Sequence, residues 1–140
     1  MCLPAPLSSG DVRRTALIID DDRSIRFVLS AALREQGWAV EEVDDGAAVE
    51  EQLERRRYDL LLLDLFMPGM NGFEVLRRIR RQRPAGVASW KTPSTVGIIV
   101  LSAAASGDGL DFAARLGADT CLRKPFEIDD VLAAVRGIKR

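Results

Sequence analysis

The sequence predicts an α/β protein in which a doubly wound parallel sheet of five strands is covered by helices. Three short apolar runs, at 15–20, 59–64 and 96–102, show little alternation of apolar and polar residues, which is typical of strands buried on both faces. The segments between these runs carry apolar residues at helical spacing. Strands that alternate with helices indicate βαβ units with right-handed crossovers, and therefore a parallel sheet.

Each element can be assigned in chain order. The expected strands are 15–20, 38–43, 59–64, 96–102 and 119–124. The expected helices are 23–37, 46–57, 72–83, 110–118 and 127–138. The first helix places five apolar residues on one face: Ile25, Val28, Leu29, Ala32 and Leu33. Gly37 is suited to end that helix, and the prolines, glycine and serines of residues 84–95 predict a loop.

The composition indicates one soluble globular domain. The chain has 140 residues, of which 47% are hydrophobic and 29% charged, and its net charge is -1. This charge gives no global attraction to nucleic acid or membrane, and no apolar run is long enough to span a bilayer. Residues 1–13 are rich in proline, serine and glycine, so we expect a flexible N-terminal arm without the features of a secretory signal.

Two residue types restrict the chemistry further. The only cysteines are Cys2, in the expected arm, and Cys121, in an expected strand, so a disulfide is not expected and a reducing cytoplasm fits. The chain contains no histidine, which excludes catalytic groups of the Ser-His-Asp and Cys-His type and any metal held by histidine. Carboxylates, hydroxyls and lysines must therefore carry any chemistry.

Such groups follow the strands at their carboxyl ends. The first strand leads into Asp20, Asp21 and Asp22, and the third ends at Asp64. The fourth ends at Ser102, and the fifth ends at Lys124, which precedes a proline. In open α/β sheets, ligands bind at this edge where the strand order reverses. For the common strand order 2-1-3-4-5, the reversal lies between the first and third strands, which are the two that end in aspartates.

This set of groups suits phosphoryl transfer. Clustered carboxylates repel one another unless they are neutralised, and Mg²⁺ binds to carboxylates, waters and phosphate oxygens. Lys124 is a compact charge suited to a phosphate oxygen, and the Ser102 hydroxyl can donate to another. An aspartate can act as a nucleophile to form an aspartyl phosphate. Phosphoryl transfer depends mainly on positioning and charge neutralisation, which these groups supply without histidine.

The motifs together resemble the receiver domain of two-component response regulators. The matching segments are "IIDDD", "SIR", "LLLDLFMPGMNGFEVL", "VLSA", "LGAD" and "KPF". The resemblance covers about residues 15–138 and implies a flavodoxin-like (βα)5 fold, with residues 14–140 forming the receiver domain. It implies that Asp64 accepts a phosphoryl group from a histidine kinase or histidine phosphotransfer protein.

The resemblance also implies roles for the other site residues. Asp20 and Asp21 would hold Mg²⁺ together with Asp64 and the backbone carbonyl of Phe66. Ser102 matches the switch hydroxyl of the family, and Lys124 matches its phosphate-binding lysine. The Lys124–Pro125 peptide bond would be cis, as a proline permits.

The same resemblance implies how the protein acts. It would be a cytoplasmic phosphoprotein rather than an enzyme, although it would assist its own phosphorylation and dephosphorylation. The sequence shows no output domain, so we expect a single-domain protein that signals through an unknown protein target, without direct binding of nucleic acid and without membrane insertion. The segments 110–118, 119–124 and 127–138 would form the face that responds to phosphorylation, and a homodimer through this face is possible.

Two departures from the family pattern stand out. The family often has an aromatic residue at the position of Cys121, whose ring moves with the switch hydroxyl. The loop from 83 to 95 is also longer than usual, and it either makes a specific contact or is slack. In addition, Phe66 and Ala104 flank the expected route of the hydrolytic water, so the bulk of Phe66 should slow self-dephosphorylation.

Plainer interpretations and rival functions remain open at the sequence level. Asp22 can be only a helix cap, Cys121 only a small core residue, and the arginines of 77–83 only a solvated helix face. One rival function is a haloacid-dehalogenase-like phosphatase, in which Asp20 is the nucleophile and Asp22 the acid/base. Another is a receiver-like binding module that is never phosphorylated.

Overall fold

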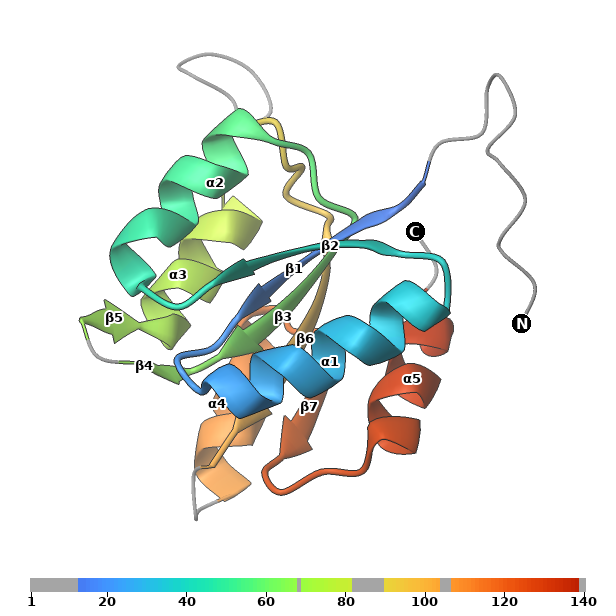
Figure 1. Ribbon diagram of the computed structural model, residues 1–140. Helices are drawn as coiled ribbons and strands as arrows, with labels where there is room; N and C mark the ends of the chain where they lie inside the picture. Colours follow the sequence, from blue (N-terminus) through green and yellow to red (C-terminus); the bar gives the residue numbers. More distant parts are fainter. Residues whose placement is uncertain (1–12, 68, 82–89, 104–106, 139–140) are drawn as a thin grey trace.

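The fold is described from a computed structural model, which covers residues 13–67, 69–81, 90–103 and 107–138. A central sheet of five parallel strands lies between two layers of helices (Figure 1). The predicted arm at 1–13 falls almost wholly outside the described residues, and so do Ala104 and the first half of the predicted loop at 84–95. Within the described ranges, the helices are all too short or too polar to span a bilayer.

The strands and helices alternate along the chain as predicted. The sheet strands are β1 (Thr15–Ile19), β2 (Ala39–Val43), β3 (Leu60–Asp64), β6 (Gly97–Ser102) and β7 (Thr120–Arg123). The helices are α1 (Arg23–Glu35), α2 (Val49–Arg55), α3 (Gly72–Arg81), α4 (Gly107–Leu116) and α5 (Ile128–Gly137), with a 3-10 turn η1 (Gly46–Ala48) before α2. A small hairpin of β4 (Phe66–Met67) and β5 (Met70–Asn71) follows β3.

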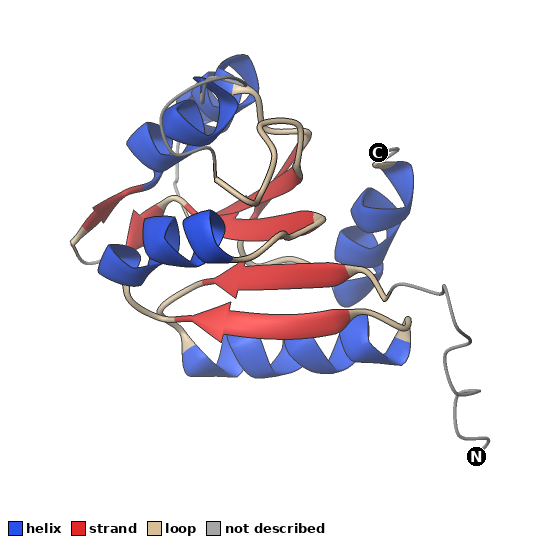
Figure 2. Cartoon of the chain, turned by 90° about the horizontal axis from the view of Figure 1, so that it is seen from above, coloured by secondary structure: helices blue, strands red, loops and turns tan. Residues whose placement is uncertain are grey.

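The strand order confirms the predicted fold class. The order β2-β1-β3-β6-β7 is 2-1-3-4-5 when the strands of the large sheet are counted along the chain, and all four pairings are parallel. Helices cover both faces of this sheet, as the view from above shows (Figure 2). The order reverses between β1 and β3, which lie side by side in register, with Ile19 opposite Leu63.

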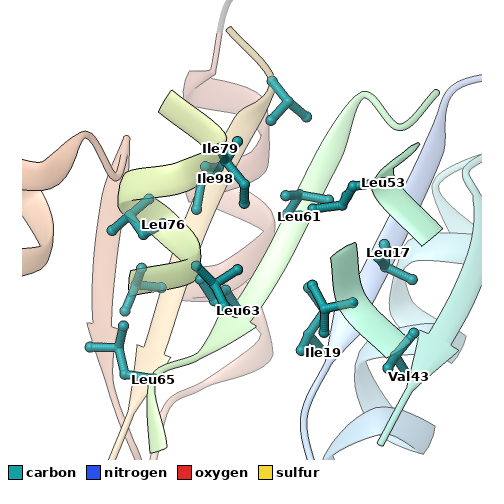
Figure 3. Packing of buried hydrophobic residues seen from close by; sticks show 14 of the residues in the cluster. Leu17, Ile19, Val43, Leu53, Leu61, Leu63, Leu65, Leu76, Ile79 and Ile98 are labelled. Carbon is teal, nitrogen blue, oxygen red and sulfur yellow. The ribbon is translucent and has the colours of Figure 1, made fainter. Parts of the chain in front are cut away.

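The apolar runs alternate between two cores, one on each face of the sheet. In β3, Leu61 and Leu63 face α2 and α3, whereas Leu60 and Leu62 face α1 and α5. Figure 3 shows the first of these cores, in which Leu61 and Leu63 pack with Leu53 of α2 and Leu76 of α3. Because both faces are covered, a strand in the middle of the sheet needs apolar residues at every position, which explains the unbroken run of leucines.

Local signals at the ends of the helices explain their bounds. Asp22 caps α1 by accepting hydrogen bonds from the backbone N–H groups of Ser24 and Ile25. Gly37 follows the end of this helix with a φ of 94°, a left-handed conformation that glycine adopts readily. Gly72 begins α3 where the backbone passes so close to Leu65 that an added Cβ would lie 2.5 Å from its Cα. A larger residue at this position would therefore displace the hairpin.

Several predicted details were wrong. The β4–β5 hairpin was not predicted, because its two-residue strands are too short to show a pattern. The helix expected at 110–118 spans 107–116 instead, since two glycines in its first turn hid its start. Val28 was placed on the buried face of α1, but it is 45% exposed, because it borders an open groove between α1 and residues 124–128.

The described end of the 83–95 loop makes a specific contact. The backbone N–H groups of Lys91 and Thr92 donate to the carbonyls of Glu54 and Leu53 in the last turn of α2. The buried Thr92 hydroxyl donates to the Arg56 carbonyl at 2.6 Å. These bonds satisfy backbone acceptors that the end of a helix leaves open. Residues 91 and 92 therefore fasten the described end of the loop to α2.

Candidate functional site

The sheet brings the predicted acidic residues together at its carboxyl edge. Asp20 directly follows β1, and Asp64 is the last residue of the neighbouring β3. Carboxylate oxygens of Asp20, Asp21 and Asp64 all lie within 4.8 Å of one another. Asp20 is 1% exposed and Asp64 is 5% exposed, whereas Asp21 is exposed. The two aspartates at the strand ends therefore form the floor of the site, and Asp21 lies at its rim.

Lys124 supplies the positive charge of this cluster. It follows β7, and its Nζ lies 2.7 Å from Asp20 Oδ2 and 3.3 Å from Asp64 Oδ2. Burial opposes the charge on the lysine, but the hydrogen bond to Asp20 and the charges of Asp64 and Asp20 outweigh this effect and raise its pKa. The lysine is thus firmly charged at neutral pH, and the Lys124–Pro125 peptide bond is cis, as the resemblance implies.

The environment of Asp64 works against its own charge. Burial raises the pKa of the Asp64 carboxyl above its ordinary value, and the charge of Asp20 raises it further. The Phe66 N–H, which donates to Asp64 Oδ1 at 3.1 Å, and the Lys124 ammonium offset part of this increase. A further positive charge nearby would therefore stabilise the ionised form of the buried Asp64 carboxylate.

The cluster fits a divalent cation. Within the described part of the chain, three carboxylates lie close together and one ammonium, that of Lys124, lies at salt-bridge distance from them, so the site carries excess negative charge. Mg²⁺ prefers carboxylate oxygens and retains several waters, which suits a site with one exposed and two buried carboxylates. Asp20, Asp21 and Asp64, three of the ligands that the resemblance implies for Mg²⁺, therefore lie close enough together to share one ion.

Asp22 does not belong to the cluster. Its Oδ1 accepts the N–H of Ser24 at 2.9 Å and that of Ile25 at 3.3 Å, and it lies at the start of α1. This is the helix-cap role that the sequence left open. An aspartate held in this way is poorly placed as the acid/base of a haloacid-dehalogenase-like phosphatase, because its carboxylate is engaged by the helix.

The hairpin after Asp64 fixes Phe66. Phe66 pairs with Asn71 across the β4–β5 hairpin, and the Asn71 side chain caps α3 through the N–H groups of Phe73 and Glu74. Phe66 is 55% exposed, and its ring meets the Phe73 ring edge to face, with the centroids 5.9 Å apart. The backbone of Phe66 is therefore held next to Asp64, and its ring leans on α3.

Ser102 also reaches this edge of the sheet. It is the last residue of β6, one position beyond Leu101, which lies opposite Asp64 in the register. Its backbone carbonyl accepts the Lys124 N–H at 2.8 Å, and the residue is fully buried. Ser102 and Lys124 thus lie at the ends of adjacent strands, as predicted.

Two contacts near the site were missed by sequence reasoning. Arg26 of α1 donates from Nη1 to the backbone carbonyl of Asp20 at 2.8 Å. The "SIR" segment was noted as a motif, but its arginine was given no role. The other contact is the ring of Phe112 in α4, 5.2 Å from Phe73, which extends the aromatic row from Phe66 to α4. Three phenylalanines in distant segments give no sequence signal of their own.

Cys121 lies beneath α4. It packs against the core, and its Sγ lies 3.5 Å from the Leu110 carbonyl. Burial raises the pKa of the Cys121 thiol, and the charge of Asp111 raises it further, so the thiol stays protonated at neutral pH. This environment is that of a small core residue rather than of a reactive thiol.

Comparison with known proteins agrees with this geometry. A family model described as the response regulator receiver domain matches residues 16–136. The transcriptional regulatory protein TcrA of Mycobacterium tuberculosis is 37% identical over 126 residues, which cover 89% of this chain and 45% of TcrA. The response regulator MprA of Mycobacterium leprae is 36% identical over 124 residues, which cover 89% of this chain and 50% of MprA. The chain thus spans about half the length of these curated relatives.

Solved structures show the same fold. The chemotaxis protein CheY4 of Vibrio cholerae superposes with a TM-score of 0.77 at 26% identity, covering 91% of this chain and 100% of that one. A putative response regulator from Chloroflexus aurantiacus superposes with a TM-score of 0.78, also at 26% identity. The match covers 89% of this chain and 96% of that one. The chain therefore belongs to the response regulator receiver domain family.

Proposed function

We propose that this protein accepts a phosphoryl group on Asp64 from a histidine of a partner kinase or phosphotransfer protein, in a reaction that depends on Mg²⁺. The observation that carries the proposal is the convergence of Asp20, Asp21 and Lys124 on Asp64, the last residue of a strand in the middle of the sheet. Receiver domains as a family accept phosphoryl groups on an aspartate, and Asp64 is the aspartate that ends the central strand β3 within 4.8 Å of the other two carboxylates.

The side chains have separable roles in this reaction. An oxygen of Asp64 attacks phosphorus and forms an O–P bond, while the N–P bond of the donor histidine breaks and its electron pair returns to the imidazole. Lys124, now shared between Asp20 and Asp64, is close enough to bind an oxygen of the arriving phosphoryl group. Ser102 lies one position beyond Leu101, the residue opposite Asp64 in the sheet. Its hydroxyl would donate a hydrogen bond to another oxygen of the phosphoryl group.

Asp20, Asp21, Asp64 and the Phe66 carbonyl would hold the Mg²⁺ ion. When bound, Mg²⁺ supplies the charge neutralisation that lets a carboxylate approach an anionic phosphoryl group. The protein contributes the placement of these ligands. It is an acceptor that assists its own phosphorylation and dephosphorylation rather than an enzyme acting on a separate substrate.

Phosphorylation of the whole protein with acetyl phosphate and Mg²⁺ tests the assignment. We expect intact-mass measurement to show one added phosphoryl group, and Asp64→Ala to abolish the addition. Asp22→Ser, which keeps a helix cap, should leave it unchanged. Unchanged labelling of Asp64→Ala would overturn the assignment, and labelling on Asp20 would favour the phosphatase. Absence of both labelling and Mg²⁺ binding in the unchanged protein would favour a binding module that is never phosphorylated.

The donor protein would dock beside Lys124. A groove of about 270 Å³ runs between the start of α1 and residues 124–128, and its walls are mainly apolar. Val28, which lines this groove, is 45% exposed, and the preceding residue of α1, Phe27, is 73% exposed. Exposed apolar side chains beside a reactive site mark a surface for a protein partner. Because this surface is continuous with Lys124, the partner that fits is the one that brings the histidine to Asp64.

A charged residue introduced on this surface should impair docking of the donor protein without impairing the phosphorylation reaction itself. We expect Val28→Asp to abolish phosphorylation by the cognate kinase while labelling by acetyl phosphate stays unchanged. An equal fall with both donors would mean that the substitution harms the site itself. Unchanged transfer from the kinase would place the donor elsewhere.

We further propose that the responding face comprises α4, β7 and α5, with Ser102 moving toward the phosphoryl group and shifting an existing equilibrium. Homodimerisation through this face, a cytoplasmic location and action as a single domain stay predictions. Co-purification with and without beryllium fluoride and Mg²⁺ would identify the downstream protein. Sedimentation of the same two samples would show whether a dimer forms.

A further inference from the structure

Arg26 has a guanidinium group in an unusual place for a charge. Its side chain is only 13% exposed, although an arginine is almost never fully buried unless it is paired. The residue belongs to the "SIR" segment, in the first turn of α1, and no step of the proposed reaction uses it. Its burial therefore calls for partners that compensate the charge.

Two partners compensate the guanidinium. Its Nη1 donates to the backbone carbonyl of Asp20 at 2.8 Å, and its Nε donates to Glu42 Oε1 at 3.2 Å. Glu42 lies on β2, and its side chain is 34% exposed. The arginine thus joins three elements: its own helix α1, the strand β2, and the turn that leaves β1 at Asp20.

The turn after β1 is held at several points. The Asp20 N–H donates to the Val43 carbonyl at 3.2 Å, and Asp20 Oδ1 accepts the Asp22 N–H at 2.9 Å. The carbonyl of Asp20 lies past the last residue of β1, and Arg26 provides its donor. The backbone N–H of Arg26 donates in turn to the Asp22 carbonyl at 3.1 Å. The peptide between Asp20 and Asp21 is therefore clamped from the side of α1.

We propose that Arg26 is a positioning residue for the divalent cation. By holding the Asp20 carbonyl, it sets the orientation of the Asp20–Asp21 peptide, and so keeps both carboxylates directed at Asp64. The proposal rests on the cation of the proposed function and adds a residue that does not touch the ion. Groups that orient metal ligands from behind typically change metal affinity by about 10-fold to 100-fold when they are removed.

The sign of the effect distinguishes positioning from simple electrostatics. Removing a positive charge close to a cation site should strengthen cation binding if only Coulomb forces act. Loss of the clamp should weaken binding, because the Asp20–Asp21 peptide must then be ordered when the ion arrives. Charge alone predicts tighter Mg²⁺ binding in an Arg26 variant. Weaker Mg²⁺ binding would therefore be evidence that Arg26 positions the Asp20–Asp21 peptide.

Isothermal titration of the whole protein with MgCl₂ tests the proposal. We expect Arg26→Met to bind Mg²⁺ about tenfold more weakly than the unchanged protein. Arg80→Met is the matched control, because Arg80 is also buried and paired but binds the carbonyls of Ser94, Val96 and Gly117, which precede β6 and β7. This control should lower stability and leave Mg²⁺ affinity unchanged.

Two milder variants keep the test decisive if Arg26→Met does not fold. Arg26→Lys retains the charge but cannot bridge both partners, so we expect an intermediate loss of affinity, and an affinity equal to that of the unchanged protein would overturn the proposal. Glu42→Gln keeps an acceptor for Arg26 and should bind Mg²⁺ normally. A loss in Glu42→Gln as large as that in Arg26→Met would assign the effect to the ion pair instead of the Asp20 carbonyl.

The outcomes also separate this proposal from the function on which it rests. If the unchanged protein does not bind Mg²⁺, the proposed function loses its cation, and the role of Arg26 falls with it. If the unchanged protein binds Mg²⁺ and Arg26→Met binds it equally well or more tightly, only the role of Arg26 is wrong.

Discussion

The Lys124 ammonium lies 2.7 Å from Asp20 and 3.3 Å from Asp64, so it is closer to an expected cation ligand than to the expected phosphoryl acceptor. This arrangement follows from charge. Asp20 is 1% exposed, and Lys124 is its one salt-bridge partner among the residues that the structure describes, so the ammonium is drawn to it. Lys124 would be available to bind a phosphoryl oxygen if a cation neutralised these carboxylates.

Lys124→Met should therefore destabilise the protein strongly in the absence of Mg²⁺. Removing one partner of a buried ion pair leaves an uncompensated charge, and we expect a loss of about 3 kcal/mol in the free energy of unfolding. Adding Mg²⁺ should restore more stability to this variant than it adds to the unchanged protein. Urea unfolding with and without Mg²⁺ measures both effects.

Arg123→Met serves as the control for Lys124→Met, since Arg123 is the exposed neighbour at the end of β7. It should change neither the stability nor the response to Mg²⁺. Equal stability of Lys124→Met and the unchanged protein without Mg²⁺ would show that Lys124 does not neutralise the cluster.

Asp64→Asn should stabilise the protein at neutral pH. The pKa of the Asp64 carboxyl is raised in the fold above its ordinary 3.8, so its charged form is penalised by folding. The protonated Asp64 carboxyl favours folding when the pH is below the pKa of this group in the unfolded chain. This stabilisation is lost as the pH rises through the pKa of Asp64 in the folded protein. The amide carries no charge and can still accept the Phe66 N–H, so we expect Asp64→Asn to unfold at a higher urea concentration than the unchanged protein at neutral pH.

The gain from Asp64→Asn should shrink as the pH falls, because a protonated aspartate and an asparagine are both neutral. Urea unfolding in acidic and in neutral buffer without Mg²⁺ measures the difference, and the exposed Asp21→Asn is the matched control, with little effect expected. A variant less stable than the unchanged protein at neutral pH would contradict the raised pKa.

Much of this site was predictable because strand ends can be read from the sequence. The leucines of β3 end at Asp64 without ambiguity, and a parallel sheet places the ends of β1, β3, β6 and β7 along one edge. Side-chain partners were not predictable in the same way. Whether Lys124 approaches Asp20 or Asp64 more closely depends on small shifts between β7 and its neighbours, which no periodic pattern encodes.

The hairpin after β3 and the role of Arg26 show two further limits. Strands of two residues have no period, so Phe66–Met67 and Met70–Asn71 could not be told from a turn. Arg26 binds a backbone carbonyl. Every residue carries a carbonyl, so the sequence does not indicate which residue is the acceptor.

Thr92→Val tests the contact between the 83–95 loop and α2. The Thr92 hydroxyl accepts the Tyr58 N–H at 3.1 Å and donates to the Arg56 carbonyl at 2.6 Å, and the residue is fully buried. Valine has a similar shape but leaves both backbone groups without this partner, so we expect a loss of about 2 kcal/mol in the free energy of unfolding.

Thr92→Ser, which keeps the hydroxyl, separates hydrogen bonding from packing. It should cost less than Thr92→Val, and both losses can be measured by urea unfolding. If valine were tolerated better than serine, packing of the methyl group rather than hydrogen bonding would fasten the loop.

Phe66→Asn should shorten the lifetime of the phosphorylated protein. The Phe66 N–H donates to Asp64 Oδ1, and its bulky ring contacts the ring of Phe73 edge to face. An apolar ring cannot orient a water by hydrogen bonding and restricts its approach, whereas asparagine is smaller and polar. We expect dephosphorylation several-fold faster than in the unchanged protein, measured as loss of the phosphoryl mass after removal of excess acetyl phosphate.

Phe73→Leu should act in the same direction but less strongly, because it loosens the Phe66 ring without removing it. A lifetime that is unchanged or longer in Phe66→Asn would show that the ring does not limit the water.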